Sequence, residues 1–314
     1  MVEINSRKAA IVGCGFVGSA SAFALMQSGL FSELVLIDAD KNRAEGEALD
    51  ISHGLPFSKP MQIYAGNYED ISDAAVIIVT AGAGQKPGET RLDLVKKNVA
   101  IFKSVIPEIA KHNKAGILLI VANPVDILTY AAKQFSGFPS NRVFGSGTVL
   151  DTARLKYLLG EHLGVDSRSI HAFIVGEHGD SEIAVWSSAN VSGIPINKFC
   201  EMRGHYQHKR AMREIAETVK NSAYEIIEKK GATYYGIAMS VKRICEAIVR
   251  DEKSILSVSS IQTGETIHGV ALSMPAIVGK HGVEGSVPIE LNEKETEALI
   301  HSAEALKAVI SDVL

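Results

Sequence analysis

The length, composition and charge of the chain exclude several classes of protein. Its 314 residues are enough for about two domains of roughly 150 residues each, and a content of 46% hydrophobic and 22% charged residues is ordinary for globular chains, not for disordered or fibrous ones. The formal net charge of -4 is spread without any block of five like charges, which argues against a nucleic-acid partner or an anionic membrane surface.

Cysteine content and the length of the apolar runs bear on the compartment. The chain has three cysteines and no C-x-x-C spacing, so we expect neither a disulfide framework nor a metal site. The longest apolar stretches, 74–83 and 116–122, are about half as long as a membrane-spanning helix, and the first residues lack the apolar segment of a signal peptide. We therefore expect a cytoplasmic protein without a membrane partner.

The first half of the chain alternates short β-branched runs with helical patterns. The predicted strands are 9–13, 33–38, 61–65, 75–80, 116–121 and 142–145. The predicted helices between them are 18–28, 42–53, 91–113 and 124–134. This alternation predicts an α/β fold with a doubly wound, mostly parallel Rossmann sheet that is buried on both faces.

After residue 147 the pattern changes to that of an α+β domain. Strand-like segments are predicted at 170–175 and 183–191, followed by a long amphipathic helix that ends near Gly231. A last helix is predicted to begin at Asn292, because Glu295 stands three residues later, and to carry an apolar stripe to the end of the chain. We expect a cofactor domain at 1–146 and a substrate domain at 147–314, without a linker between them.

A G-x-G-x-x-G pattern follows the first strand and opens the first helix, which is the context that gives this motif meaning. Gly13 permits the tight turn, Gly15 the approach of a pyrophosphate to the backbone, and Gly18 the contact of helix and strand. Asp38 ends the second strand, where a carboxylate accepts bonds from ribose hydroxyls and repels a 2′-phosphate. The acid therefore favours NAD over NADP. The spacing of strand, glycines, helix and acid favours a cofactor site over a glycine turn that binds nothing. Cys14 is expected to be a small buried filler.

Three further segments carry candidate catalytic residues, each with a plain structural alternative. Arg91 ends a polar, Gly- and Pro-rich segment that resembles a mobile loop, but it could equally just begin a helix. Asp151 and Arg154 stand at i and i+3 on a helix, where a surface ion pair is the plain alternative. His178 emerges at the end of an apolar strand, and it is one of ten histidines.

These residues match the needs of one reaction. Hydride transfer between a nicotinamide and an alcohol carbon requires a group that gives or takes a proton, a group that orients it, and a group that binds the charged end of the substrate. A histidine, an aspartate and two arginines meet those needs, because imidazole titrates near neutrality and guanidinium binds a carboxylate with two parallel bonds.

Five segments together resemble the bacterial branch of the NAD-dependent L-lactate dehydrogenases, within the lactate/malate dehydrogenase family. They are AGAGQKPGETRLDL, VANPVDILTY, GSGTVLDTARLKYLL, VGEHGDSE and KGATYYGIAM, and the resemblance covers essentially the whole chain. It implies reversible hydride transfer between NADH and pyruvate, giving L-lactate and NAD⁺. It also implies a homotetramer.

The resemblance implies a role for each matched site residue. His178 would be the general acid and base, Asp151 its orienting partner, Arg154 the ligand of the substrate carboxylate, and Arg91 the group that polarises the carbonyl. Asn123 and Thr233 would line the substrate pocket. In addition to Gly13, Gly15 and Gly18 of the glycine motif, the cofactor contacts implied in the same way are Val17, Asp38, Arg43, Tyr64, Gly82, Ala83, Ser104, Val121, Asn123 and Ile237.

Gln85 distinguishes the two candidate substrates, pyruvate and oxaloacetate. Malate dehydrogenases of the same fold carry arginine at this loop position to pair with a second carboxylate, whereas a neutral amide suits the methyl group of pyruvate. The resemblance therefore favours pyruvate over oxaloacetate. A malate or broader 2-oxoacid dehydrogenase remains the alternative within the class, and a catalytically silent NAD-binding protein is the alternative outside it.

One departure from the family pattern concerns regulation. Many bacterial lactate dehydrogenases are activated by fructose 1,6-bisphosphate through an arginine two residues beyond the substrate-binding arginine and a histidine before the catalytic strand end. His171 matches the second position, but the first is Lys156, which has the charge without the planar fork. We expect weak or absent activation, and His171 could equally be a plain strand residue.

Overall fold

The computed structural model describes residues 3–84 and 88–314, and the first half of this described chain forms a doubly wound parallel sheet. Its strands lie in the order β6-β5-β4-β1-β2-β3, with every neighbouring pair parallel. The bounds are β1 (Asn5–Val12), β2 (Glu33–Ile37), β3 (Gln62–Ala65), β4 (Ala74–Val79), β5 (Ile117–Ile120) and β6 (Val143–Gly145). The predicted parallel Rossmann sheet is confirmed.

Helices cover both faces of this sheet. They are α1 (Phe16–Ser28), α2 (Lys41–Ser52), α3 (Arg91–His112) and α4 (Val125–Ser136). Alternate residues of β1 point to opposite sides, so that Ala10 and Val12 pack in the core beneath α3 and α4, while Ala9 and Ile11 pack in the core beneath α1 and α2. Burial on both faces explains why the strands read as continuous apolar runs.

The second half of the described chain contains a smaller antiparallel sheet and five helices. The small sheet has the order β7-β8-β9, with bounds β7 (Ile170–Val175), β8 (Ile183–Val191) and β9 (Ile194–Pro195). The helices are α5 (Val149–Leu163), α6 (Ile196–Met202), α7 (His208–Lys230), α8 (Tyr235–Val249) and α9 (Glu293–Val313). The predicted helix ends are confirmed: α7 stops before Gly231, which has φ +85°, and Asn292 and Glu295 form the reciprocal cap of α9.

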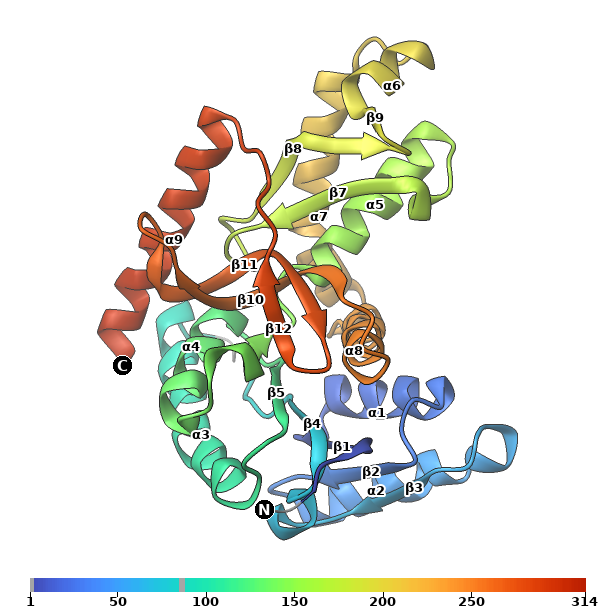
Figure 1. Ribbon diagram of the computed structural model, residues 1–314, viewed down its shortest axis with the longest axis vertical. Helices are drawn as coiled ribbons and strands as arrows, with labels where there is room; N and C mark the ends of the chain where they lie inside the picture. Colours follow the sequence, from blue (N-terminus) through green and yellow to red (C-terminus); the bar gives the residue numbers. More distant parts are fainter. Residues whose placement is uncertain (1–2, 85–87) are drawn as a thin grey trace.

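Three strands near the end of the chain were not predicted from the sequence. They are β10 (Ser254–Thr263), β11 (His268–Gly279) and β12 (Gly282–Ser286), and they form an antiparallel extension of the first sheet. The join lies between β6 and β10, where Ser259 stands opposite Gly145. Figure 1 shows these strands, in orange to red, between the blue-green half and the yellow half. The predicted domain boundary at residue 146 stays a prediction, because the sheet runs across it.

The helices of the described residues do not have the character of membrane spans. None of those helices is both long enough and apolar enough to cross a bilayer.

Candidate active site

The glycine loop between β1 and α1 leaves open space where a cofactor phosphate would lie. A Cβ atom on Gly13 would stand 2.5 Å from the backbone nitrogen of Ala81, and one on Gly18 would stand 1.9 Å from the carbonyl oxygen of Gly13. A Cβ on Gly15 would meet nothing within 4 Å. Gly13 and Gly18 thus serve the close packing of the loop, and Gly15 borders open space at the N-terminus of α1, where unpaired N–H groups favour an anion.

A groove of about 490 Å³ runs from this loop across the carboxyl ends of the strands. Asp38 lies in its wall, where its carboxylate accepts bonds from the backbone N–H groups of Cys14, at 2.6 Å, and Asp40, at 2.9 Å. The predicted cofactor residues that line the groove are Gly13, Gly15, Asp38, Arg43, Gly82 and Ser104. A carboxylate fixed at the end of β2, beside an open helix N-terminus, fits a dinucleotide with free ribose hydroxyls.

Tyr64, one of the predicted cofactor contacts, is not among the residues that line this groove. Its hydroxyl donates a hydrogen bond of 2.8 Å to Glu33, the first residue of the neighbouring strand β2. Tyr68, one helical turn later in the chain, lines the groove instead. Tyr64 lies within β3, whereas Tyr68 follows that strand at the carboxyl end of the sheet, where the groove runs.

The remaining predicted cofactor residues lie behind or beside the groove. Val17, Val121 and Ile237 pack with the core beneath α1 and α8. The backbone N–H of Ala83 donates to the side chain of Asn98, which in turn donates to the backbone oxygen of Asn123 at 2.7 Å. Asn98, which the sequence reading missed, therefore connects the loop of Gly82 and Ala83 with the predicted substrate pocket.

Cys14 is buried, as predicted. Burial, together with the nearby charge of Asp38, raises the pKa of its thiol to about 12, so the thiol stays protonated at neutral pH. It is a packing residue of the loop.

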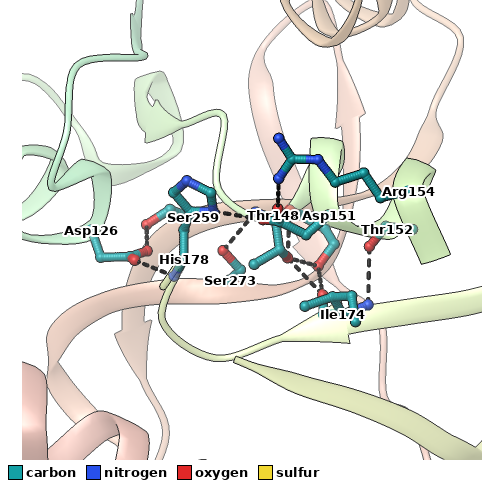
Figure 2. Close-up of polar contacts among 10 residues, drawn as sticks. Asp126, Thr148, Asp151, Thr152, Arg154, Ile174, His178, Ser259 and Ser273 are labelled. Atoms are coloured by element: carbon teal, nitrogen blue, oxygen red, sulfur yellow. Dashed lines mark hydrogen bonds and ion pairs between the residues drawn. The ribbon is translucent and has the colours of Figure 1, made fainter. Parts of the chain in front are cut away.

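The catalytic candidates Asp151 and His178 meet as the sequence predicts. Asp151 lies in the first turn of α5, with 1% of its side chain exposed, and His178 follows the end of β7. The ring Nδ1 of His178 stands 2.6 Å from a carboxylate oxygen of Asp151 (Figure 2). This contact fixes the ring and leaves Nε2 as the nitrogen that can exchange a proton with a ligand.

Arg154, Asp151 and His178 together form a charged triad. The guanidinium of Arg154 donates a bond of 2.7 Å to the other carboxylate oxygen of Asp151, and 14% of the arginine side chain is exposed. The plain alternative, a surface ion pair on one helix, is wrong because Asp151 is buried. Burial acts to raise the pKa of Asp151, but the neighbouring positive charges of His178 and Arg154 outweigh it and hold the pKa below its ordinary value.

The environment of His178 favours its protonated form. Burial alone would lower the pKa of the imidazole, but the carboxylate of Asp151, with smaller effects of Asp126 and Glu182, raises the pKa to about 9. His178 therefore carries a proton at neutral pH and loses it as the pH rises through about 9.

Asp126 is a buried carboxylate that sequence reading did not single out. It lies at the start of α4, accepts a bond of 2.7 Å from the backbone N–H of His178, and accepts another of 2.6 Å from the hydroxyl of Ser259 on β10. Burial raises its pKa to about 6, so the group is ionised at neutral pH. Figure 2 shows His178 between the two aspartates, with Asp151 at its ring and Asp126 at its backbone.

Arg91 begins α3, as one of its two sequence-based readings has it, and its side chain lies beside the His178 segment. Its guanidinium contacts the carboxylates of Glu177, at 2.6 Å, and Asp180, at 2.7 Å, and 52% of its side chain is exposed. These two acids flank His178 in the chain. Gln85, the predicted substrate-discriminating residue, lies outside the described residues. Thr233 is half-buried in the turn before α8.

Lys156 and His171 lie together at a second cavity. This cavity measures about 370 Å³, and Arg243 and Phe173 also line it. Burial lowers the pKa of Lys156 from its ordinary value. The two predicted effector residues are thus brought together, on the α5 and β7 elements that also support the catalytic pair.

Comparison with known proteins identifies similar chains over the whole length. Two family models of the lactate/malate dehydrogenases match this chain. The NAD binding domain matches residues 7–145, and the alpha/beta C-terminal domain matches residues 148–314. The L-lactate dehydrogenase of Acetivibrio thermocellus is 52% identical over 305 residues, 97% of this chain and 96% of that protein. That of Thermoanaerobacterium saccharolyticum is 53% identical over 307 residues, 98% of this chain and 99% of that protein.

Solved structures agree with these sequence comparisons. A lactate dehydrogenase from a Medee basin deep-sea metagenome library superimposes with a TM-score of 0.94 at 44% identity, covering 98% of each chain. The minor L-lactate dehydrogenase of Enterococcus mundtii, in a ligand-bound form, superimposes with a TM-score of 0.95 at 43% identity, covering 99% of each chain.

Proposed function

This chain belongs to the lactate/malate dehydrogenase family, and from that premise we propose that it transfers hydride reversibly between NADH and pyruvate, giving L-lactate and NAD⁺. The observation that carries the proposal is the charged triad of Arg154, Asp151 and His178, in a chain that also has a groove suited to NAD. Binding of NAD alone requires none of these three residues, which argues against a catalytically silent protein.

Each residue of the charged triad has one task in this reaction. Arg154 binds the carboxylate of pyruvate through the guanidinium N–H groups that Asp151 does not occupy. His178 then points Nε2 at the substrate carbonyl oxygen and donates its proton there, while Asp151 keeps the ring oriented. Arg91 leaves Glu177 and Asp180 and adds positive charge next to the same oxygen as negative charge develops on it. Bound NADH supplies the hydride.

The proposal predicts a strong preference for pyruvate over oxaloacetate. By the family resemblance, the second carboxylate of oxaloacetate would lack a cationic partner, because the discriminating position holds Gln85, a neutral amide. An unpaired charge in a closed site costs several kcal/mol, or several powers of ten in kcat/KM. Replacing Gln85 with arginine is expected to move the preference toward oxaloacetate. NADH oxidation, followed by absorbance with each substrate, measures the ratio of the two kcat/KM values.

Two outcomes of that assay count against the assignment. Comparable kcat/KM values for the two substrates in the unaltered protein would favour a malate or broader 2-oxoacid dehydrogenase. An unchanged ratio in Gln85→Arg would remove Gln85 from the specificity determinants. Lys59→Arg, which adds a guanidinium far along the chain from the site residues, controls for a general effect of arginine.

We also propose that fructose 1,6-bisphosphate activates this protein weakly or not at all. The cavity with Lys156 and His171 supports some attraction for phosphate, but an ammonium lacks the planar fork that binds phosphate oxygens in pairs. A titration with the bisphosphate is expected to change the pyruvate KM by less than about twofold, and Lys156→Arg is expected to enlarge the effect. A large fall in KM with the unaltered protein contradicts this proposal.

The expected assembly and compartment belong to the same proposal. Exposed apolar side chains beside the groove between α1 and α8, among them Phe23, Tyr235 and Met239, support burial of that face in a homotetramer. The three buried free cysteines, Cys14, Cys200 and Cys245, support a reducing cytoplasmic setting.

A further inference from the structure

Glu182 is a carboxyl group beside the catalytic pair that the proposed mechanism does not use. It stands four residues after His178 and directly before β8. One of its carboxylate oxygens, one of Asp151 and a ring nitrogen of His178 all lie within 4.8 Å of one another. Its Oε1 atom is buried and has no hydrogen-bond partner among the described residues. Such an oxygen is costly to leave ionised.

Charged groups face Glu182 from each element packed against it. Asp151 and Arg154 approach from α5, His178 from the segment before Glu182 itself, and Lys220 from α7. Arg154 is already bonded to Asp151, and His178 is bonded to the same acid. Arg154 and His178 therefore both share their charge with Asp151, and neither serves Glu182 exclusively. Burial, followed by the charge of Asp151, raises the pKa of Glu182 to about 8.

We propose that Glu182 is a positioning residue that must be neutral for a substrate carboxylate to bind at Arg154. This inference rests on the proposed function and deepens it, because it adds a second proton to the site. With Glu182 neutral, His178 balances Asp151 and the substrate carboxylate balances Arg154. With Glu182 ionised, the same space holds one more negative charge, which Lys220 offsets less than His178 or Arg154 does. This charge repels the substrate carboxylate and competes with it for Arg154.

The pH dependence of pyruvate reduction distinguishes one required proton from two. If His178 alone must be protonated, log(kcat/KM) for pyruvate falls at alkaline pH with a limiting slope of about -1. If Glu182 must also be protonated, the slope approaches about -2 above the two pKa values, which lie near 8 and 9. The slope depends on the number of groups and not on the absolute activity of a variant.

The test compares Glu182→Gln with the unaltered enzyme between about pH 6 and about pH 10. Glutamine keeps the shape of the neutral acid and cannot ionise, so the limiting slope is expected to change from about -2 to about -1. Glu217→Gln, on the exposed face of α7, is the matched control and is expected to keep the steeper slope. Equal slopes in Glu182→Gln and the unaltered enzyme overturn the inference.

A binding measurement supports the test without relying on turnover. Oxamate, an unreactive carboxylate with the shape of pyruvate, is added to the enzyme with NADH in weak buffer at about pH 9.5. The unaltered enzyme is expected to take up more than one proton per oxamate bound, and Glu182→Gln at most one. Uptake of one proton or less by the unaltered enzyme overturns the inference even if the glutamine variant does not fold.

The same experiments separate this inference from the proposed function. If the unaltered enzyme does not oxidise NADH with pyruvate at any pH, the proposed function fails. If it does so with a slope of about -1, the proposed function stands and the role of Glu182 fails. Glu182→Asp, which can still ionise, is expected to keep the steeper slope.

Discussion

Replacing His178 with alanine is expected to lower kcat for pyruvate reduction by about 10²- to 10⁴-fold, with little change in NADH affinity. The imidazole is the protonated group of the Asp151 pair, and alanine removes both the proton and the ring that aims it. The cofactor groove is lined by other residues and is unaffected. Absorbance at saturating NADH measures turnover, and NADH fluorescence measures cofactor binding.

The control for this variant is His301→Ala, an exposed histidine on α9. It is expected to keep normal turnover. Retained turnover in His178→Ala would reject the assigned acid and base. Loss of NADH binding together with turnover would instead indicate a general structural defect of the variant.

Replacing Arg154 with leucine is expected to lower kcat/KM for pyruvate by about two to four powers of ten, mainly through a higher KM. The substrate carboxylate loses its partner, and the buried carboxylate of Asp151 loses one of its two cations. The kcat/KM of Arg154→Lys is expected to lie between those of Arg154→Leu and the unaltered enzyme, because lysine restores the charge without the paired N–H groups. Steady-state kinetics at fixed NADH gives both constants.

The control for the arginine variants is Arg210→Leu on the exposed surface of α7. Its ion pair with Glu214 is exposed, and such pairs contribute little to stability. An unchanged pyruvate KM in Arg154→Leu would contradict the assigned carboxylate site. The His178 pKa is also expected to rise in Arg154→Leu, because Asp151 would then be balanced by His178 alone.

Local patterns were enough to predict the cofactor half of the molecule. The glycine spacing, the acid at the end of β2 and the alternation of strands with helices each depend on residues close together in the chain, and the structure has them as predicted. The i, i+3 spacing of Asp151 and Arg154 likewise predicts their contact. Features that depend only on residues close together in the chain can be predicted from a single sequence.

Contacts between distant segments were not available from local patterns. Asp151 and His178 are 27 residues apart, and their pairing was expected only from the family resemblance. Asp126 and Glu182 read as ordinary polar residues, because burial of an acid depends on the packing of other elements around it. The join of β10 to β6 was not available either, because Ser259 and Gly145 are more than a hundred positions apart.

The pairing of β10 with β6 has a consequence for synthesis of the chain on the ribosome. Until residues 254–263 emerge, β6 is an exposed sheet edge, and the hydroxyl of Ser259 is not there to hold Asp126. The nascent first half can therefore fold early around its glycine loop, yet the backbone of His178 is anchored only when most of the chain has been made. Cofactor-binding competence is thus expected to precede catalytic competence as the chain grows.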